Sequence, residues 1–317
     1  MTTPAIEAQS LVKTFGKQRA VDGVSLTVPT GSVYGVLGPN GAGKTTTVRM
    51  LATLLRPDGG SARVFGRDVV ADATAVRSLI GVTGQYASVD EDLTATENLV
   101  VFSRLLGLSR RDSTAKAVEL LEEFGLTDAA SRPLKLFSGG MRRRLDLAAS
   151  LIAAPPLLFL DEPTTGLDPR TRAQMWDTIR RLVADGSTVL LTTQYLDEAD
   201  QLCDRIAVID HGRVIADDTA DGLKSSVGTS ALSLTLDDRN QIDDARALVA
   251  GHLGVEVTVS AEAARLTAPM ADTSSTPDIL IRLRDFGIEV SEITVTKPSL
   301  DEVFLTLTGK NAHEDAA

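Results

Sequence analysis

Ser32-Val33-Tyr34-Gly35-Val36-Leu37-Gly38-Pro39-Asn40-Gly41-Ala42-Gly43-Lys44-Thr45 is the stretch that decides the fold of this chain. Its first six residues form an apolar run that predicts a strand, and residues 44–55 predict a helix because their apolar side chains recur on one face. Residues 38–46 therefore join a strand to a helix. Glycines here let backbone N–H groups converge on phosphate oxygens, and the helix directs its positive end at the same anion. The stretch predicts a phosphate-binding loop.

Two side chains of this loop, and two acids downstream, extend the prediction to a nucleotide with Mg²⁺. Lys44 places a positive charge on the β- and γ-phosphates, and Thr45 offers a hydroxyl to Mg²⁺. The apolar run 157–160 ends in Asp161, which can hold Mg²⁺ through water, and Glu162, which can act as general base on the attacking water. Two acids after an apolar run can also merely begin a loop, but the phosphate loop upstream favours the catalytic interpretation.

A second anion site is predicted at Ser138, Gly139 and Gly140. These residues precede a predicted helix, so a hydroxyl and unobstructed backbone amides would gather at a helix N-terminus. One chain then carries two sites for a γ-phosphate, and both can serve a single ATP only if two chains pair head to tail. An ordinary glycine-rich turn is the alternative interpretation.

The order of strand and helix patterns predicts an α/β fold for residues 5–223. Strands of the core alternate with helices, which implies a mostly parallel sheet covered on both faces. Residues 87–150 look helical throughout and predict a helical subdomain, with a capping box at Thr94 and Glu97. The predicted core elements are strand 157–161, helix 169–184, strand 188–192, helix 196–203 and strand 205–209. The pair His211-Gly212 predicts a tight hairpin turn after the last of these strands.

A composition rich in Lys, Ser and Gly at 224–230 predicts a linker to a small C-terminal α+β domain, residues 231–309. Its predicted order is βαββαβ, followed by a last helix that a capping box at Ser299 and Glu302 begins. We expect residues 310–317 to be a disordered tail. The predicted elements are strand 231–236, helix 240–252, strands 255–260 and 263–267, helix 275–286 and strand 288–295. The domain contains no catalytic motif that we recognise; it either stabilises a dimer or is a plain structural appendage.

Composition excludes several other functions. A net charge of −11 and an aromatic content of 4% argue against a nucleic-acid partner, which needs clustered cations and stacking rings. Cys203 is the single cysteine, so we expect a small buried hydrophobe rather than a disulfide or metal ligand. The sequence shows neither a signal peptide nor an apolar run of membrane-spanning length. We therefore expect a cytosolic chain whose membrane role comes through a partner.

Together, these motifs resemble in content and order the nucleotide-binding domain of ABC-type ATPases, over residues 5 to about 220. The resemblance implies a P-loop fold with a mixed sheet and a helical subdomain, ATP and Mg²⁺ as cofactors, and a membrane permease and a second copy as partners. It implies catalytic roles for Glu162, Gln194 and Lys44, and metal contacts for Thr45, Gln85 and Asp161. The implied nucleotide contacts are Phe15, Gly38, Pro39, Asn40, Gly41, Ala42, Gly43, Lys44, Thr45, Thr46, Gln85, Ser138, Gly139, Gly140 and Asp168.

Three of these positions keep a simpler alternative. Phe15, which the resemblance stacks on adenine, can be a core aromatic. Gln85, which it makes a γ-phosphate and Mg²⁺ sensor, can be a surface amide. Asp168, which it places at the dimer interface, can be a helix cap before Pro169.

Two departures from the common pattern narrow the resemblance. Met141 stands where the signature usually ends in Gln, and Gln194 stands where a His is usual. Gln can donate a hydrogen bond to the γ-phosphate but cannot take up a proton at neutral pH, so its role would be positioning. The stretches 82–86, 139–146 and 191–195 resemble the ATP-binding subunits of daunorubicin-resistance-type drug exporters, and residues 299–305 resemble the tail of that group.

That resemblance implies a subunit at the cytoplasmic face of the membrane that powers efflux of drugs or other hydrophobic compounds. An importer subunit, a lipid-export subunit and a non-transport ABC ATPase are the alternatives. The arginines at 142–144 suggest nucleic acid, but a solvated face of the signature helix, close to the neighbouring subunit's nucleotide, is the interpretation we favour.

Overall fold

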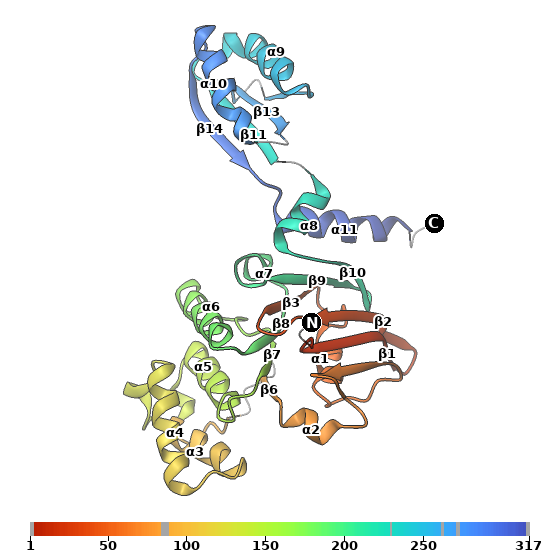
Figure 1. The fold of residues 1–317 in the computed structure, drawn as a ribbon. Coiled ribbons are helices and arrows are strands. Elements are labelled where there is room, and N and C mark those ends of the chain that lie inside the picture. Colours follow the sequence, from red (N-terminus) through yellow and green to blue (C-terminus); the bar gives the residue numbers. More distant parts are fainter. Residues whose placement is uncertain (1–2, 84–88, 229, 261–262, 271–272, 315–317) are drawn as a thin grey trace. The chain divides into compact units, whose positions relative to one another are not determined.

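The computed structural model describes residues 3–83, 89–228, 230–260, 263–270 and 273–314. The chain divides into two compact units, Met1–Ala220 and Asp221–Ala317, which are described separately (Figure 1). No helix in the described ranges is long and apolar enough to cross a bilayer.

A six-stranded sheet forms the centre of the first unit, in the order β10-β9-β3-β8-β7-β6. All neighbouring strands are parallel except the β9–β10 pair, so the predicted α/β class is confirmed. Strands β3, β7 and β8 are buried along their whole length. Their carboxyl ends lie at one edge of the sheet, where ligands of such sheets bind. The strands are β3 (Val33–Leu37), β6 (Ile80–Thr83), β7 (Leu157–Asp161), β8 (Thr188–Thr193), β9 (Arg205–Asp210) and β10 (Arg213–Asp218).

A second, antiparallel sheet in this unit has the order β2-β1-β4-β5. It shares one apolar core with helix α1 (Lys44–Leu51) and the central sheet. The helix predicted over residues 44–55 ends earlier, because Thr53 adopts a left-handed conformation (φ 62°). The strands are β1 (Ile6–Phe15), β2 (Gln18–Val28), β4 (Gly59–Val64) and β5 (Arg67–Asp68), and the short helix α2 (Ala73–Arg77) precedes β6.

The region predicted to be helical throughout, 87–150, is instead a set of separate helices. Gly107 (φ 92°) and Gly125 (φ 61°) end the first two by turning the chain into the left-handed region. The capping box at Thr94 and Glu97 is confirmed, since each side chain accepts a hydrogen bond from the other residue's backbone N–H. Figure 1 shows α3 and α4 beside α5. The elements are α3 (Ala95–Leu105), α4 (Arg110–Glu123), η1 (Thr127–Ala129), η2 (Leu134–Leu136) and α5 (Gly139–Ser150).

Two further helices, α6 (Pro169–Ala184) and α7 (Leu196–Leu202), complete the first unit. The predicted turn between β9 and β10 is confirmed, because His211 (φ 44°) and Gly212 (φ 77°) both have the positive φ of a two-residue hairpin loop. Cys203 is buried, as predicted, and burial raises the pKa of its thiol.

The second unit has the predicted βαββαβ order and a four-stranded antiparallel sheet, β12-β13-β11-β14, as in ferredoxin-like domains. Helices α9 and α10 pack on one face of this sheet (Figure 1). The capping box at Ser299 and Glu302 is confirmed. The elements are α8 (Ala220–Val227), β11 (Ser230–Leu236), η3 (Arg239–Gln241), α9 (Ile242–Leu253), β12 (Thr258–Ser260), β13 (Arg265–Met270), η4 (Thr273–Ser275), α10 (Thr276–Asp285), β14 (Val290–Thr296) and α11 (Leu300–Glu314).

Several boundaries of this second unit differ from the sequence predictions. Most of the expected linker, 224–230, belongs to helix α8, and the strand expected from residue 255 begins at Thr258. Helix α11 continues to Glu314, through most of the segment that we expected to be disordered. Short polar runs without Pro permit either state, so composition alone could not decide these boundaries.

Candidate nucleotide site

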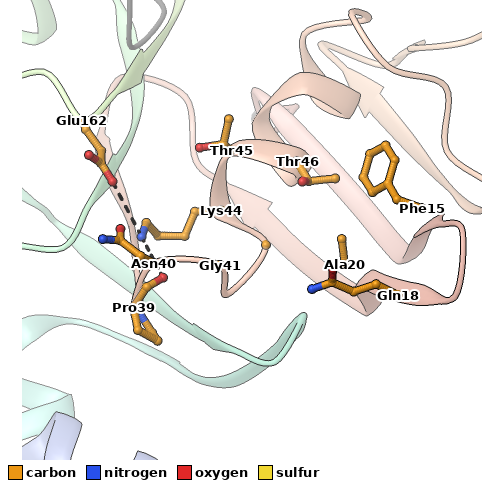
Figure 2. Close-up of a pocket in the computed structure, with 11 residues that line it drawn as sticks. Phe15, Gln18, Ala20, Pro39, Asn40, Gly41, Lys44, Thr45, Thr46 and Glu162 are labelled. Atoms are coloured by element: carbon orange, nitrogen blue, oxygen red, sulfur yellow. Dashed lines mark hydrogen bonds and ion pairs between the residues drawn. The ribbon is translucent and has the colours of Figure 1, made fainter.

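A cavity of about 260 Å³ lies where the loop after β3 meets the end of β7. Figure 2 shows the Lys44 and Glu162 side chains directed toward each other on one side of it and Phe15 on the other. The cavity is lined by Phe15, Gln18, Ala20, Pro39, Asn40, Gly41, Gly43, Lys44, Thr45, Thr46 and Glu162.

Two glycines of the phosphate loop, Gly38 and Gly43, are required by close backbone contacts. Gly43 has φ 106°, and a Cβ there would lie 2.4 Å from the carbonyl oxygen of Ala20. A Cβ on Gly38 would lie 2.2 Å from the carbonyl oxygen of Ile209. At these two positions the loop is therefore held against β2 and β9 in a form that only glycine permits.

Lys44 begins helix α1 and is 5% exposed. Its ammonium donates hydrogen bonds to the carbonyl oxygens of Gly38 (2.7 Å) and Pro39 (3.1 Å) and lies 3.9 Å from Oε1 of Glu162 (Figure 2). Burial lowers the pKa of Lys44, and the charges of Glu162 and Asp161 act in the opposite direction. A phosphate entering the loop would add negative charge beside Lys44 and, like the two carboxylates, favour its protonated form. The site is therefore suited to bind phosphate next to this cation.

Thr45 and Asp161 bring hard oxygen donors together at the end of β7. The Thr45 hydroxyl donates to Oδ1 of Asp161 (3.2 Å), and the Thr192 hydroxyl makes a short hydrogen bond to the same oxygen. Mg²⁺ is usually held by one or two protein oxygens together with water and substrate phosphates. This pair fits that requirement, although the described residues contain no cluster of three or more His, Cys, Asp or Glu side chains for a metal.

Glu162 follows β7 in a left-handed conformation, φ 50°. Its backbone N–H donates to both the carbonyl and the hydroxyl oxygen of Thr192, each at 3.1 Å. One carboxylate oxygen faces Lys44, and the other accepts a hydrogen bond from the Thr165 hydroxyl (3.2 Å). The carboxylate lies at the cavity wall and cannot rotate without breaking one of these contacts. A fixed orientation of this kind suits a general base.

Phe15 is half exposed (50%), so the alternative of a core aromatic is wrong. It ends β1 at the cavity, with the Lys13 ammonium 5.8 Å from the centre of its ring. Gln18 and Ala20 of β2 also line the cavity, and our sequence analysis missed both. Only the antiparallel pairing of β1 with β2, which puts Phe15 opposite Gln18, brings them there.

The second anion site does not line this cavity within one chain. Ser138 caps helix α5, and its hydroxyl oxygen accepts a hydrogen bond from the N–H of Met141 (3.2 Å). Gly140 lies against α6, since a Cβ there would come within 2.5 Å of Cγ2 of Thr171. Asp168 caps α6 by accepting from the N–H (3.0 Å) and the hydroxyl (2.6 Å) of Thr171, as its alternative interpretation predicted. The two anion sites of one chain are thus separate.

Of the two glutamines with predicted roles, Gln85 and Gln194, the structure describes only Gln194. Gln194 follows β8, the strand between β3 and β7, and is partly buried at the same sheet edge as the phosphate loop and Asp161. Gln85 lies outside the described residues.

The arginines at 142–144 make hydrogen bonds and an ion pair within the chain. Our prediction that they form a solvated face of the signature helix is therefore wrong. Arg143 is mostly buried and donates to backbone carbonyls after β7, and Arg144 donates to the carbonyl oxygen of Phe124 (3.0 Å). Arg142 is more exposed and forms an ion pair with Glu91 (2.6 Å). Acceptors distant in sequence decide these contacts, so the run of charge alone could not reveal them.

Comparisons with known proteins agree with this architecture. Residues 21–165 match the ABC transporter family. The chain is 57% identical to the daunorubicin/doxorubicin resistance ATP-binding protein of Streptomyces peucetius, over 98% of this chain and 94% of that protein. It is 40% identical to Nod factor export ATP-binding protein I of Sinorhizobium fredii, over 96% of this chain and 86% of the relative. A solved dimeric ATP-binding cassette in a post-hydrolysis state, with ADP and phosphate bound, has 25% identity and a TM-score of 0.62 over 68% of this chain and 98% of its own.

Proposed function

We propose that two copies of this chain pair head to tail around ATP and so drive a membrane permease. The chain belongs to the ATP-binding subunits of ABC transporters, in the group of daunorubicin-resistance proteins. As a member of that family it is an ATP-hydrolysing subunit of an exporter. One observation carries the proposal. The cavity holds Lys44 and Glu162 but not Ser138, whose site lies against α6 of the same chain. A second copy would supply the missing donors.

The geometry supports hydrolysis by in-line attack of water on the γ-phosphate. Lys44 would exchange its loop carbonyls for phosphate oxygens, and Thr45 and Asp161 would hold Mg²⁺. When bound, Mg²⁺ neutralises charge on the phosphate oxygens. Glu162 orients a water and takes its proton as the oxygen attacks phosphorus and the β-phosphate oxygen of ADP leaves.

Three further groups have roles in the proposed site. The Ser138 hydroxyl and the amides of Gly139 and Gly140, from the second copy, would stabilise the spreading charge on the γ-phosphoryl group. Gln194 would donate a hydrogen bond to the same group without accepting its proton, since an amide is not basic at neutral pH. Phe15 would stack on the adenine ring, as its exposure at the cavity edge allows.

The proton-accepting role of Glu162 has a direct test. The variant Glu162→Gln keeps the shape of the side chain but removes its basicity, so ATP binding should persist while turnover falls at least ~10²-fold, the scale of one lost catalytic group. Steady-state phosphate release and ATP binding by calorimetry measure the two effects. Turnover within a few-fold of the unaltered protein would exclude Glu162 as the base.

We further propose that the cargo is a drug or another hydrophobic compound and that the subunit works at the cytoplasmic face of the membrane. The resistance protein of Streptomyces peucetius supports this class of cargo, and the Nod factor export protein shows that the same architecture also serves other exported compounds. Within export, a lipid is the competing class of cargo.

Purification of the chain with its membrane permease in lipid vesicles tests the cargo class. Daunorubicin should stimulate ATP hydrolysis by the complex, and the Glu162→Gln complex should show no stimulation. Unchanged hydrolysis over a full range of daunorubicin, with stimulation by a lipid or a soluble solute instead, would contradict drug export while leaving the ATPase assignment intact.

A further inference from the structure

Arg143 is the residue that ties the helix of the second anion site to the loop that carries Glu162. It lies in the second turn of α5, and its side chain is 13% exposed. Its guanidinium donates to three consecutive carbonyl oxygens, at the last residue of β7 and the two residues that follow. Nη2 donates to Asp161 (2.6 Å) and Glu162 (3.0 Å), and Nε donates to Pro163 (3.0 Å). A single side chain therefore holds the backbone on both sides of the proposed base.

The conformation of Glu162 explains why such a tie is needed. An L-residue other than glycine at φ 50° is strained, and the strain persists only where the surroundings fix it. Thr192 fixes the peptide before Glu162 by accepting its N–H with two oxygens. Arg143 fixes the peptide after it by donating to the Glu162 carbonyl. Loss of either contact would let the backbone relax and carry the carboxylate away from Lys44.

Arginine has the chemistry that this position requires. Its planar fork has five N–H donors, so one group can reach several carbonyls and still face the buried carboxylate of Asp146, 3.8 Å from Nη1. The bonds carry charge at the donor and are therefore stronger than neutral ones. Lysine also brings a positive charge, but its single compact ammonium cannot reproduce the fork.

We propose that Arg143 is a positioning residue that holds Glu162 in its left-handed, water-activating conformation, an inference that rests on the proposed function of Glu162. The same helix begins at Ser138, the donor offered to the other copy's nucleotide. Arg143 thus connects the end of α5 that would contact one ATP to the base that would hydrolyse the other.

The test compares Arg143→Ala and Arg143→Lys with the matched control Arg142→Ala in the full chain. Arg142 neighbours Arg143 on α5, but its guanidinium contacts Glu91 and the carbonyl oxygens of Leu134 and Lys135, not the segment that carries Glu162. We expect Arg143→Ala to lower kcat at least ~10-fold with the KM for ATP within about twofold, as for loss of an interaction made only in the transition state. The kcat of Arg143→Lys should lie between those of Arg143→Ala and the unaltered protein, and the kcat of Arg142→Ala should equal that of the unaltered protein.

A second readout separates positioning from damage to α5. The Glu162→Gln variant has no base to position. Adding Arg143→Ala to it should therefore change the ATP concentration at which half of the protein is dimeric by no more than about twofold. Arg143→Ala with normal kcat, or a raised KM and weakened ATP-dependent pairing, would overturn the proposal. Arg143→Lys supplies the same comparison if the alanine variant does not fold. Normal turnover of Glu162→Gln alone would instead reject the proposed base, which makes the two failures distinguishable.

Discussion

Replacement of Thr192 by Val tests how the buried carboxylate of Asp161, the proposed Mg²⁺ ligand, is held. Valine has nearly the shape of threonine but no hydroxyl. The change removes the hydrogen bond that Thr192 donates to Oδ1 of Asp161 and one of the two that Thr192 accepts from the Glu162 N–H. Asp161 is 5% exposed, so water cannot readily replace this donor. The Glu162 N–H keeps its bond to the Thr192 carbonyl oxygen (3.1 Å), so this buried donor is not left without an acceptor.

The size of the effect follows from these contacts. A hydrogen bond to a charged group contributes about 1.5–3 kcal/mol. After the change, Oδ1 of the buried Asp161 carboxylate keeps the longer bond from the Thr45 hydroxyl (3.2 Å). The unit Met1–Ala220 is in the size range where Tm falls by roughly 2–4 °C per kcal/mol. We therefore expect Thr192→Val to lower the Tm of this unit by roughly 3–12 °C.

Differential scanning calorimetry of the full chain measures this shift, in the transition that ATP moves to higher temperature. Thr192→Ser is the matched control, because it keeps the hydroxyl and loses only a methyl group. The Tm of the serine variant should lie close to that of the unaltered protein and above that of the valine variant. A valine variant no less stable than the serine variant would refute the argument that this hydroxyl stabilises the Asp161 carboxylate.

Three further predictions concern the cavity and the second unit. Lys44→Ala should abolish tight ATP binding, because the cation of the loop is lost; unchanged affinity by calorimetry would count against the phosphate loop. Phe15→Ala should weaken ATP binding roughly 5- to 150-fold, the scale of one base–aromatic stack, and Lys17→Ala outside the lined cavity is its control. Deletion of residues 221–317 should leave nucleotide binding intact but weaken dimerisation; sedimentation identical to that of the full chain would identify the second unit as a structural appendage.

Local sequence predicted the phosphate loop well because its function depends on residue types at fixed spacing. Glycines that a Cβ would clash with, at positions 38 and 43, and the lysine that begins the helix are all adjacent in the chain. The βαββαβ order and both capping boxes were predictable for the same reason. Each of these signals lies within a few residues of the feature that it specifies.

Contacts between distant segments were beyond the reach of local sequence. Thr192 and Arg143 come from β8 and α5, and both meet the end of β7 only in the folded chain. Gln18 is at the cavity because β2 pairs with β1. The early end of α1 depends on the left-handed turn at Thr53, which helix periodicity does not reveal.

The measurement that tests the central claim most directly is sedimentation of Glu162→Gln with ATP, beside Glu162→Gln combined with Ser138→Arg. If each ATP is closed between the phosphate loop of one copy and Ser138 of the other, the single variant should sediment as an ATP-dependent dimer. The double variant should bind ATP equally well, since Ser138 does not line its own cavity, yet remain a monomer. A double variant that dimerises as readily as the single one would contradict the shared site.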